Sequence, residues 1–289
     1  MICSICPRHC NIDREISCGY CKSPYKIKLA RASLHYWEEP CISGKNGSGT
    51  VFFSGCNLRC VYCQNYEISH DCKGIEVSDE RLVEIFENLI KQGANNINLV
   101  NPTHYAYAIA NVLKSWKSPV PIVYNSSGYE KLDTIKALDG LVDIYLPDLK
   151  YIRADKALRY SGAEDYFDKA SAVLLEMRKQ VEDRFDGDGM MKSGMIVRHL
   201  ILPQNTNSSM KIIDWLKENL NDTYVSLMAQ YTPCTNLDSY PEINRKITQR
   251  EYDKVADYAI SSGLEKIFLQ ELSSAQSSFI PEFDFTGVI

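Results

Sequence analysis

The sequence has no apolar run of the roughly 18 residues that a membrane-spanning helix needs. Its first residues, MICSICPRHC, lack the apolar segment of a signal peptide, so we expect a cytoplasmic protein. Basic residues are not in excess either, because the formal net charge is -5. Without a broad basic surface, a nucleic-acid partner is not expected. These absences predict a globular protein with neither membrane nor nucleic-acid partners.

Cysteine, by contrast, is abundant, with 11 cysteines in 289 residues. Disulfides are rare in a reducing compartment, and an odd number of cysteines leaves one without a disulfide partner. Most of the cysteines fall into two groups, within residues 3–21 and 56–63. Clustered thiols of this kind are typical of metal or iron–sulfur sites.

Strand and helix signals alternate from about residue 50 onward. Residues 78–93 show a helix pattern, with Ser78 in the capping position, apolar side chains on one face and Gly93 at the end. Strands are predicted at residues 50–55, 96–100, 121–125, 143–146, 195–202, 224–230 and 266–269. Further helices are predicted at residues 105–116, 130–138, 155–183, 209–219 and 249–262. Repeated strand–helix units indicate an α/β fold with parallel strands, either a full or partial βα-barrel or a doubly wound open sheet.

Residues 1–45 differ from the rest in being rich in Cys, Gly and Pro, with little periodicity. We predict an irregular, cysteine-rich metal-binding segment there, and a barrel domain in residues 46–289. In such barrels, functional side chains gather at the carboxyl ends of the strands. Polar motifs that follow predicted strands are therefore the candidates for a site.

The stretch FFSGCNLRCVYCQN places Cys56, Cys60 and Cys63 directly after the first predicted barrel strand. Four thiolates would close a cubane iron–sulfur cluster, whereas three leave one iron open to another ligand. The alternative is a closed site in which Cys72 supplies the fourth thiolate.

The spacing C-x3-C-x2-C, with Tyr62 just before the last cysteine, resembles the signature of the radical S-adenosylmethionine (SAM) superfamily. The resemblance implies that Cys56, Cys60 and Cys63 bind a [4Fe-4S] cluster whose open iron chelates SAM. It also implies that an electron from the cluster cleaves SAM to a 5′-deoxyadenosyl radical, which abstracts hydrogen from a substrate. A non-catalytic metal or electron-transfer protein is the alternative from another functional class.

The stretch 37–69, with the motifs CPRHC, NPTHY, NSSGYE and DIYLPDLKY, is similar to the branch related to pyruvate formate-lyase activating enzyme. This resemblance implies a partial βα-barrel of about six parallel strands and an activating-enzyme-like oxidoreductase. It implies a protein or peptide substrate, with glycyl-radical formation as one outcome, and a reductant such as flavodoxin or ferredoxin. A radical SAM enzyme for a small molecule is the alternative.

The same resemblance implies contacts to SAM at or near the strand ends. The residues implied are Tyr62, Thr103, His104, Asn125, Ser127, Asp148, Lys150, Arg198 and Gln230. For some of them a structural role stays open, since Thr103 can cap the following helix and Asp148 can simply pair with Lys150. His199 should lie on the opposite face of its strand from Arg198 and is expected to pack.

A second metal, zinc or iron–sulfur, is predicted on the N-terminal thiols. Its ligands would be Cys3, Cys6, Cys10 and Cys21, with Cys18 as an alternative to Cys21. The roles of Cys41, Cys72 and Cys234 stay open. Glu38, Glu39 and Cys41 either line the site or belong to a packed loop.

Overall fold

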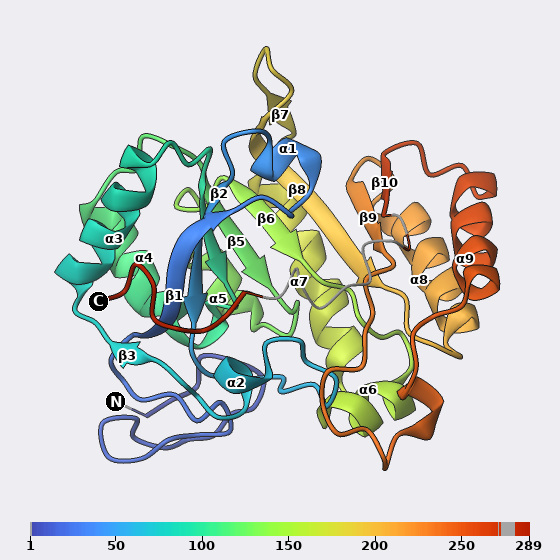
Figure 1. Ribbon diagram of the computed structural model, residues 1–289, viewed down its shortest axis with the longest axis horizontal. Helices are drawn as coiled ribbons and strands as arrows, with labels where there is room; N and C mark the ends of the chain where they lie inside the picture. Colours follow the sequence, from blue (N-terminus) through green and yellow to red (C-terminus); the bar gives the residue numbers. More distant parts are fainter. Residues whose placement is uncertain (1, 271, 273–280) are drawn as a thin grey trace.

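The computed structural model describes residues 2–270, 272 and 281–289, which form one ten-stranded sheet flanked by helices (Figure 1). The strand order is β10-β9-β8-β6-β5-β4-β2-β1-β3, with β7 paired to β8. The strands are β1 (Lys28–His35), β2 (Ser48–Phe53), β3 (Ile75–Glu76), β4 (Ile97–Val100), β5 (Ile122–Ser126), β6 (Ile144–Pro147), β7 (Arg184–Phe185), β8 (Met191–Leu200), β9 (Tyr224–Met228) and β10 (Ile267–Leu269). The series β2-β4-β5-β6-β8-β9-β10 is parallel throughout, which confirms the predicted α/β class.

Helices connect the parallel strands and cover the sheet. They are α1 (Pro40–Ser43), α2 (Tyr66–Ser69), α3 (Asp79–Lys91), α4 (Ala106–Ser115), α5 (Leu132–Lys136), α6 (Ala154–Ser161), α7 (Tyr166–Gln180), α8 (Thr206–Asn219) and α9 (Gln249–Ser261), with short 3-10 turns η1 (Thr103–Tyr105) and η2 (Pro241–Ile243). Figure 1 shows α3 and α4 beside one end of the sheet and α8 and α9 beside the other. Within the described part of the chain, no helix has both the length and the apolar character needed to cross a bilayer.

Helix α3 forms where the sequence predicts a helix, with Ser78 as its N-cap. The Ser78 hydroxyl accepts a hydrogen bond from the backbone N–H of Arg81, which satisfies one of the free donors of the first turn. Its apolar face is buried in the core beside β1, β2 and β4.

The single long helical region predicted at residues 155–183 is instead two helices, α6 and α7. Gly162 separates them in the left-handed conformation, with φ 57°, and its N–H caps α6 by bonding to the Leu158 carbonyl. This conformation suits glycine, which has no Cβ to clash. The helical periodicity continues across the glycine, and the break was therefore missed.

The N-terminal segment is not irregular throughout, because β1 within it belongs to the main sheet. Its strand pairs antiparallel with β2, from Leu29 opposite Phe53 to His35 opposite Ser48. The buried Leu29 and Ala32 pack into the same core as α3. The division of the chain at residue 45 stays a prediction, but β1 and α1 join the body that follows it.

Helix α1 fills the inside of the curved sheet near the starts of the parallel strands. Its Ile42 and Cys41 pack against Val123 of β5, Ile144 of β6 and Ile196 of β8. Side chains two residues apart share one face of a strand, so residues 125 and 198 lie on this same face, nearer the carboxyl ends. The face of the sheet that packs against α1 is therefore apolar near the starts of the strands. Toward their carboxyl ends it is polar, and there it lines a cavity.

Candidate active site

The three-cysteine loop follows β2 and opens onto a cavity of about 590 Å³. Cys56, Cys60 and Cys63 all line this cavity. The backbone N–H groups of Leu58 and Arg59 point at Cys56 Sγ, at 3.3 and 3.4 Å. These N–H groups favour negative charge on that sulfur, as a thiolate ligand would carry.

The turn into this loop depends on Gly55. Its φ is +91°, and a Cβ added there would lie 1.9 Å from Ser23 Oγ and 2.7 Å from the Cys21 carbonyl oxygen. Only glycine fits such a position. The N-terminal segment therefore packs directly against the start of the cysteine loop.

The three thiols fit an iron–sulfur cluster rather than a structural disulfide or a single ion. All three are free cysteines, and burial raises the pKa of Cys56 and raises that of Cys63 to about 12. Without positive charge nearby Cys56 and Cys63 would stay protonated, and the iron of a cluster would supply that charge. Among the described residues, no three Cys, His, Asp or Glu side chains are placed to hold a single metal ion.

Cys72 lies apart from this trio. It is buried, its thiol donates to the Lys22 carbonyl at 3.2 Å, and it does not line the cavity. The alternative of a fourth thiolate from Cys72 has no support in this geometry. Three ligands on an open cavity leave room for an external fourth one.

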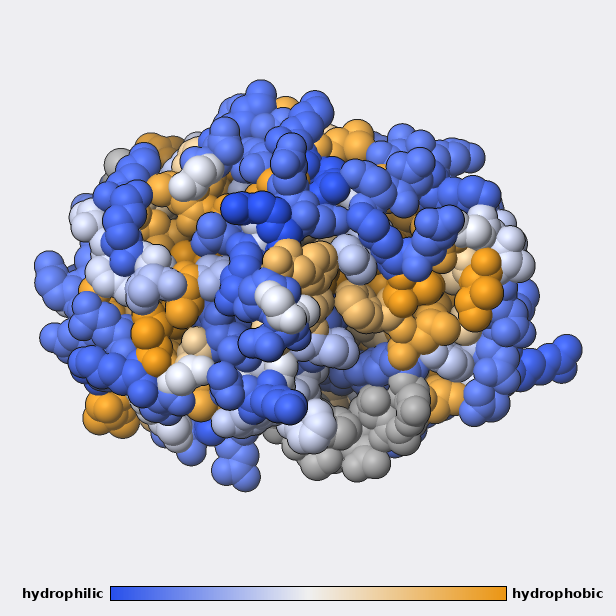
Figure 2. Space-filling view, turned by 90° about the horizontal axis from the view of Figure 1, so that it is seen from above, coloured by the Kyte–Doolittle hydropathy of each residue, from blue (hydrophilic) through white to orange (hydrophobic). Residues whose placement is uncertain are grey.

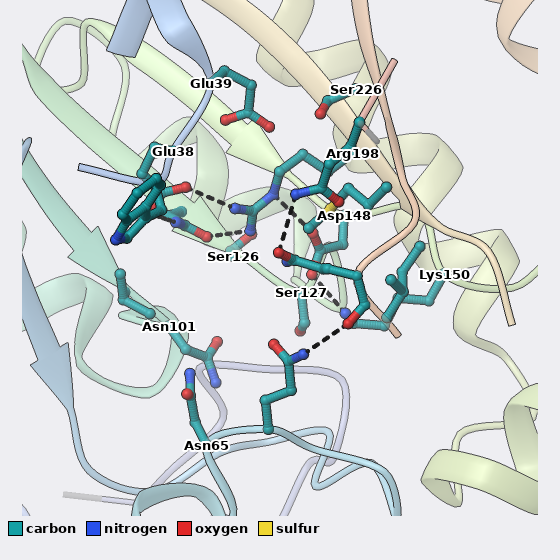
Figure 3. A pocket seen from close by; sticks show the side chains of 18 of the residues that line it. Glu38, Glu39, Asn65, Asn101, Ser126, Ser127, Asp148, Lys150, Arg198 and Ser226 are labelled. Carbon is teal, nitrogen blue, oxygen red and sulfur yellow. Dashed lines mark hydrogen bonds and ion pairs between the residues drawn. The ribbon is translucent and has the colours of Figure 1, made fainter. Parts of the chain in front are cut away.

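Most of the polar residues predicted to contact SAM line the same cavity, and Figure 3 shows Ser127, Asp148, Lys150 and Arg198 there. Those that line it are Tyr62, Asn125, Ser127, Asp148, Lys150, Arg198 and Gln230. Parallel strands end at one edge of a sheet, which is why motifs far apart in sequence converge here. The Tyr62 hydroxyl lies 2.7 Å from the Tyr151 hydroxyl, so the ring beside Cys63 is held in place.

Arg198 lies at the centre of a buried charge network. Its Nε donates to Asp148 Oδ1 at 3.0 Å, its Nη1 to Glu38 Oε2 at 3.2 Å and its Nη2 to Asn125 Oδ1 at 2.5 Å. Lys150 Nζ donates to the other Asp148 oxygen at 2.6 Å. Buried charges of this kind are stable only when they are paired and hydrogen-bonded.

The pKa values of these groups follow from burial and pairing. Burial alone would raise the pKa of Asp148, but Lys150 and Arg198 outweigh it and lower the pKa. Asp148 likewise outweighs burial at Lys150 and raises its pKa. Burial dominates at Glu38 and raises its pKa despite Arg198. At neutral pH, Asp148, Lys150 and Arg198 are therefore all charged.

Thr103 and His104 are the two predicted SAM contacts that the structure does not bring to the cavity. Both are fully buried: the Thr103 hydroxyl donates to Glu130 Oε1 at 2.5 Å, and His104 Nε2 lies 2.8 Å from the Ser54 carbonyl. Asn101, two residues earlier, lines the cavity instead. Asn101 has φ 48°, which turns the chain away from the cavity before Thr103.

His199 packs as expected, on the far side of β8 from Arg198. Its ring is buried and bonds the Leu149 carbonyl at 2.7 Å and the Ser209 hydroxyl at 2.9 Å. Burial lowers its pKa to about 4, so the ring is neutral. It links β8 to α8 rather than to the cavity.

Sequence reasoning missed several polar residues that line the cavity, namely Asn65, Asn101, Ser126 and Ser226. It left Glu38 and Glu39 open, and the structure places both on the cavity wall, while Cys41 packs beneath them. Glu38 reaches the site only because β1 pairs antiparallel with β2. That pairing has no local sequence signal, although the adjacent carboxyls of Glu38 and Glu39 could have marked the position.

The N-terminal cysteines lie outside the cavity. Cys6 and Cys21 are buried, Cys3 and Cys10 are half-buried, and Cys18 is exposed. Cys10 Sγ accepts a hydrogen bond from the Tyr20 backbone at 3.3 Å. Burial raises the pKa of Cys6 to about 12, and Cys21, Glu130 and Cys3 add to the increase. A second metal on them stays a prediction.

Comparison with known sequences links the chain to one family. The model of the radical SAM superfamily matches residues 50–216. Uncharacterized protein MJ0674 of Methanocaldococcus jannaschii is 29% identical over 92% of this chain and 76% of its own. Uncharacterized protein MJ0808 of the same organism is 24% identical over 60% of this chain and 53% of its own.

Solved structures share the fold at low identity. Streptococcus suis SuiB matches with a TM-score of 0.53 and 15% identity, over 79% of this chain and 50% of its own. The hydrogenase maturase HydG from Carboxydothermus hydrogenoformans gives 0.52 and 15%, over 80% and 56%. Methylornithine synthase (PylB) gives 0.50 and 12%, over 74% and 60%. The chain thus spans between half and three fifths of these proteins, and the likeness concerns the fold alone.

The family match covers more than half of the chain and includes the cysteine loop and the residues Asp148, Lys150 and Arg198, which we call the charged wall of the cavity. It confirms the resemblance drawn from C-x3-C-x2-C. The chain belongs to the radical SAM superfamily.

Proposed function

We propose that this radical SAM enzyme holds its [4Fe-4S] cluster on Cys56, Cys60 and Cys63 and binds SAM between that cluster and the charged wall. The superfamily implies the cluster and SAM, and the proposal is the assignment of residues to them. The observation that carries it is that all three thiols open onto the same cavity as Asp148 and Lys150. When bound, the cluster and SAM supply reductive cleavage of SAM and hydrogen-atom abstraction from a substrate.

The protein's own side chains account for binding and orientation. Lys150 uses one donor on Asp148, so its remaining N–H groups are able to receive the carboxylate of SAM. Ser127 lines the cavity with a buried hydroxyl that has no partner among the described residues, so it is able to bond a ligand.

The test compares a cysteine that lines the cavity, Cys63, with one that does not, Cys72. In Cys63→Ala, the cluster should lose iron and SAM cleavage should stop after anaerobic reconstitution. Cys72→Ala is the control, because it removes a thiol near the same loop that lies outside the cavity. Iron and sulfide content and the electron paramagnetic resonance spectrum with and without SAM are measured beside 5′-deoxyadenosine formation. Loss of the cluster in Cys72→Ala as well would reject a three-ligand site.

The finer assignment that we propose is activating-enzyme-like: hydrogen abstraction from a protein or peptide, with electrons from a flavodoxin or ferredoxin. Its support is the resemblance of residues 37–69 to the branch related to pyruvate formate-lyase activating enzyme. A small-molecule substrate is the second candidate, favoured by the ionisable side chains of Glu38, Glu39 and Arg198 that line the cavity. Reduced enzyme with SAM is incubated with separated protein and small-molecule fractions of a host extract. Stimulation of 5′-deoxyadenosine formation by the small-molecule fraction alone would reject the protein substrate.

We also propose a second metal on Cys3, Cys6, Cys10 and Cys21, with Cys18 as the alternative fourth ligand. Its support is the spacing of these cysteines within residues 3–21, since no three of the described side chains are grouped to hold one ion in this structure. Metal binding by such a segment would also stabilise its fold. The test is elemental analysis of the triple variant Cys56→Ala, Cys60→Ala, Cys63→Ala. Neither zinc nor iron in that protein would reject the second site.

A further inference from the structure

The two residues that precede α1, Glu38 and Glu39, also line the cavity, and Glu38 contacts Arg198 of the charged wall. Glu38 is satisfied by the protein. Its Oε1 accepts from Asn98 at 3.0 Å and from Asn125 at 3.4 Å, and its Oε2 accepts from Arg198. Glu39 is different, because its Oε2 is buried and has no hydrogen-bond partner among the described residues.

The direction of the Glu39 side chain is set by its backbone. Glu39 is the residue before α1, and its carbonyl accepts hydrogen bonds from Ile42 at 2.8 Å and Ser43 at 3.1 Å. Its φ is -50°, and its ψ of 145° lies in the extended range to which Pro40 restricts the preceding residue. The carboxyl is therefore held toward the cavity by the start of a helix that is itself locked in the core.

The charges around the cavity leave Glu39 in need of a partner. Arg198 already donates to Glu38 and Asp148, and Lys150 donates to Asp148. Burial raises the pKa of Glu39 more strongly than Arg198 and the Ser226 hydroxyl lower it, and Glu38 adds to the increase. A buried carboxyl oxygen without a partner is costly, and a bound cation would remove that cost.

We propose that Glu39 binds a positively charged nitrogen of the substrate, an ammonium or guanidinium group. This inference gives the substrate class of the site, and it rests on the function proposed above. Apolar Phe52, Leu200 and Met228 line the cavity walls and suit the alkyl stem of such a group. The same chemistry is found in free amines and in the basic side chains of peptides.

SAM carries an ammonium group of its own, but the position of Glu39 argues against that partner. Figure 3 shows Glu39 on the far side of Arg198 from Asn65, which lies two residues beyond Cys63. A ligand on the cluster iron lies near the cysteines, so its chelating ammonium is remote from Glu39. The cation at Glu39 belongs to the second reactant.

The experiment measures probe binding to reconstituted, SAM-loaded enzyme by equilibrium dialysis. The cationic probes are 1,5-diaminopentane, a free amine, and Nα-acetyl-lysine methylamide, a peptide mimic. Their neutral controls are pentane-1,5-diol and the Nε-acetylated peptide mimic. We expect at least one cationic probe to bind with a dissociation constant below about 10 mM. Glu39→Gln should weaken the binding of that probe by about tenfold or more. If 1,5-diaminopentane binds more tightly, the substrate is a free amine, and if Nα-acetyl-lysine methylamide binds more tightly, it is a peptide.

Glu39→Asp, which keeps the charge on a shorter side chain, should recover part of the affinity, and the melting temperature of each variant reports folding. Glu84→Gln on the exposed face of α3 is the control for loss of one carboxylate. Equal binding of neutral probes, no binding of either cation, or unchanged affinity in Glu39→Gln would overturn the inference. Weaker SAM binding in Glu39→Gln would assign the carboxyl to SAM and overturn it too. Wild-type enzyme that holds neither cluster nor SAM would instead reject the proposed function.

Discussion

Glu130, behind the charged wall, should make the stability of the protein depend on pH. It is fully buried, with Oε1 accepting from Thr103 and from Tyr124, while Oε2 has no partner among the described residues. Burial raises its pKa from 4.5 to about 8, against the opposing hydrogen bonds from Thr103, Ser126 and Tyr124. No cation is among the groups that shift it, so the folded protein keeps this carboxyl protonated.

The direction and size of the effect follow from linkage. Below pH 4.5 the group is protonated in both states and its contribution to stability is complete. As the pH rises toward 8 the unfolded chain releases the proton and the folded one does not, so stability falls. Each unit of difference between the pKa values in the folded and unfolded states corresponds to about 1.4 kcal/mol. The free energy of unfolding should therefore fall by on the order of 4 kcal/mol across this pH range.

Glu130→Gln removes the titration but keeps an acceptor for Thr103. We expect the variant to be close to wild type in free energy of unfolding near pH 5, and to become the more stable protein by several degrees in melting temperature near pH 8. Melting curves of both proteins across this range give the difference, in which all other titrating groups cancel. Glu84→Gln, whose carboxylate is 60% exposed, is the control. Parallel curves for wild type and Glu130→Gln would refute the reasoning.

Two further predictions concern the site. Lys150→Met should weaken SAM binding by about tenfold or more, because it removes a cation that faces the cavity. The iron content should stay at the wild-type level. Unchanged SAM affinity in equilibrium dialysis would count against Lys150 as a residue that binds SAM. Gly55→Ala should lower the melting temperature and the iron bound per chain, since its Cβ would lie 1.9 Å from Ser23 Oγ. Gly93→Ala is the matched control, with a similar φ of +94° and nothing within 4 Å, and should cost only about 1 kcal/mol. Equal losses in the two glycine variants would show that strain, and not the contact with Ser23, is responsible.

Local sequence signals predicted most of this fold because they describe short-range physics. The capping serine and apolar face of α3 determine that helix by themselves, and C-x3-C-x2-C determines one loop. The left-handed Gly162 between α6 and α7 depends on a backbone angle, and β1 depends on an antiparallel partner. Neither has a periodic pattern, so neither was predicted.

The candidate site shows the same limit. Asp148 and Lys150 could be placed because they end a strand, and every parallel strand ends at the same edge. Thr103 and His104 follow a strand as well, but the positive φ of Asn101 turns them into the core. Glu38 is 160 residues from Arg198 in sequence, and only the paired β1 brings the two together.

The network around Arg198 bears on the prediction that this residue contacts SAM, which stays a prediction. The resemblance gave Arg198 a direct contact, but each of its three nitrogens already donates to a protein acceptor, on Asp148, Glu38 or Asn125. Lys150 donates once, to Asp148, and a lysine ammonium has three N–H groups. A guanidinium has five N–H groups, so Arg198 and Lys150 each keep two that are not used by these bonds, and both line the cavity. The two side chains are therefore both able to donate to a carboxylate, and Arg198 also orients the acceptors Asp148, Glu38 and Asn125.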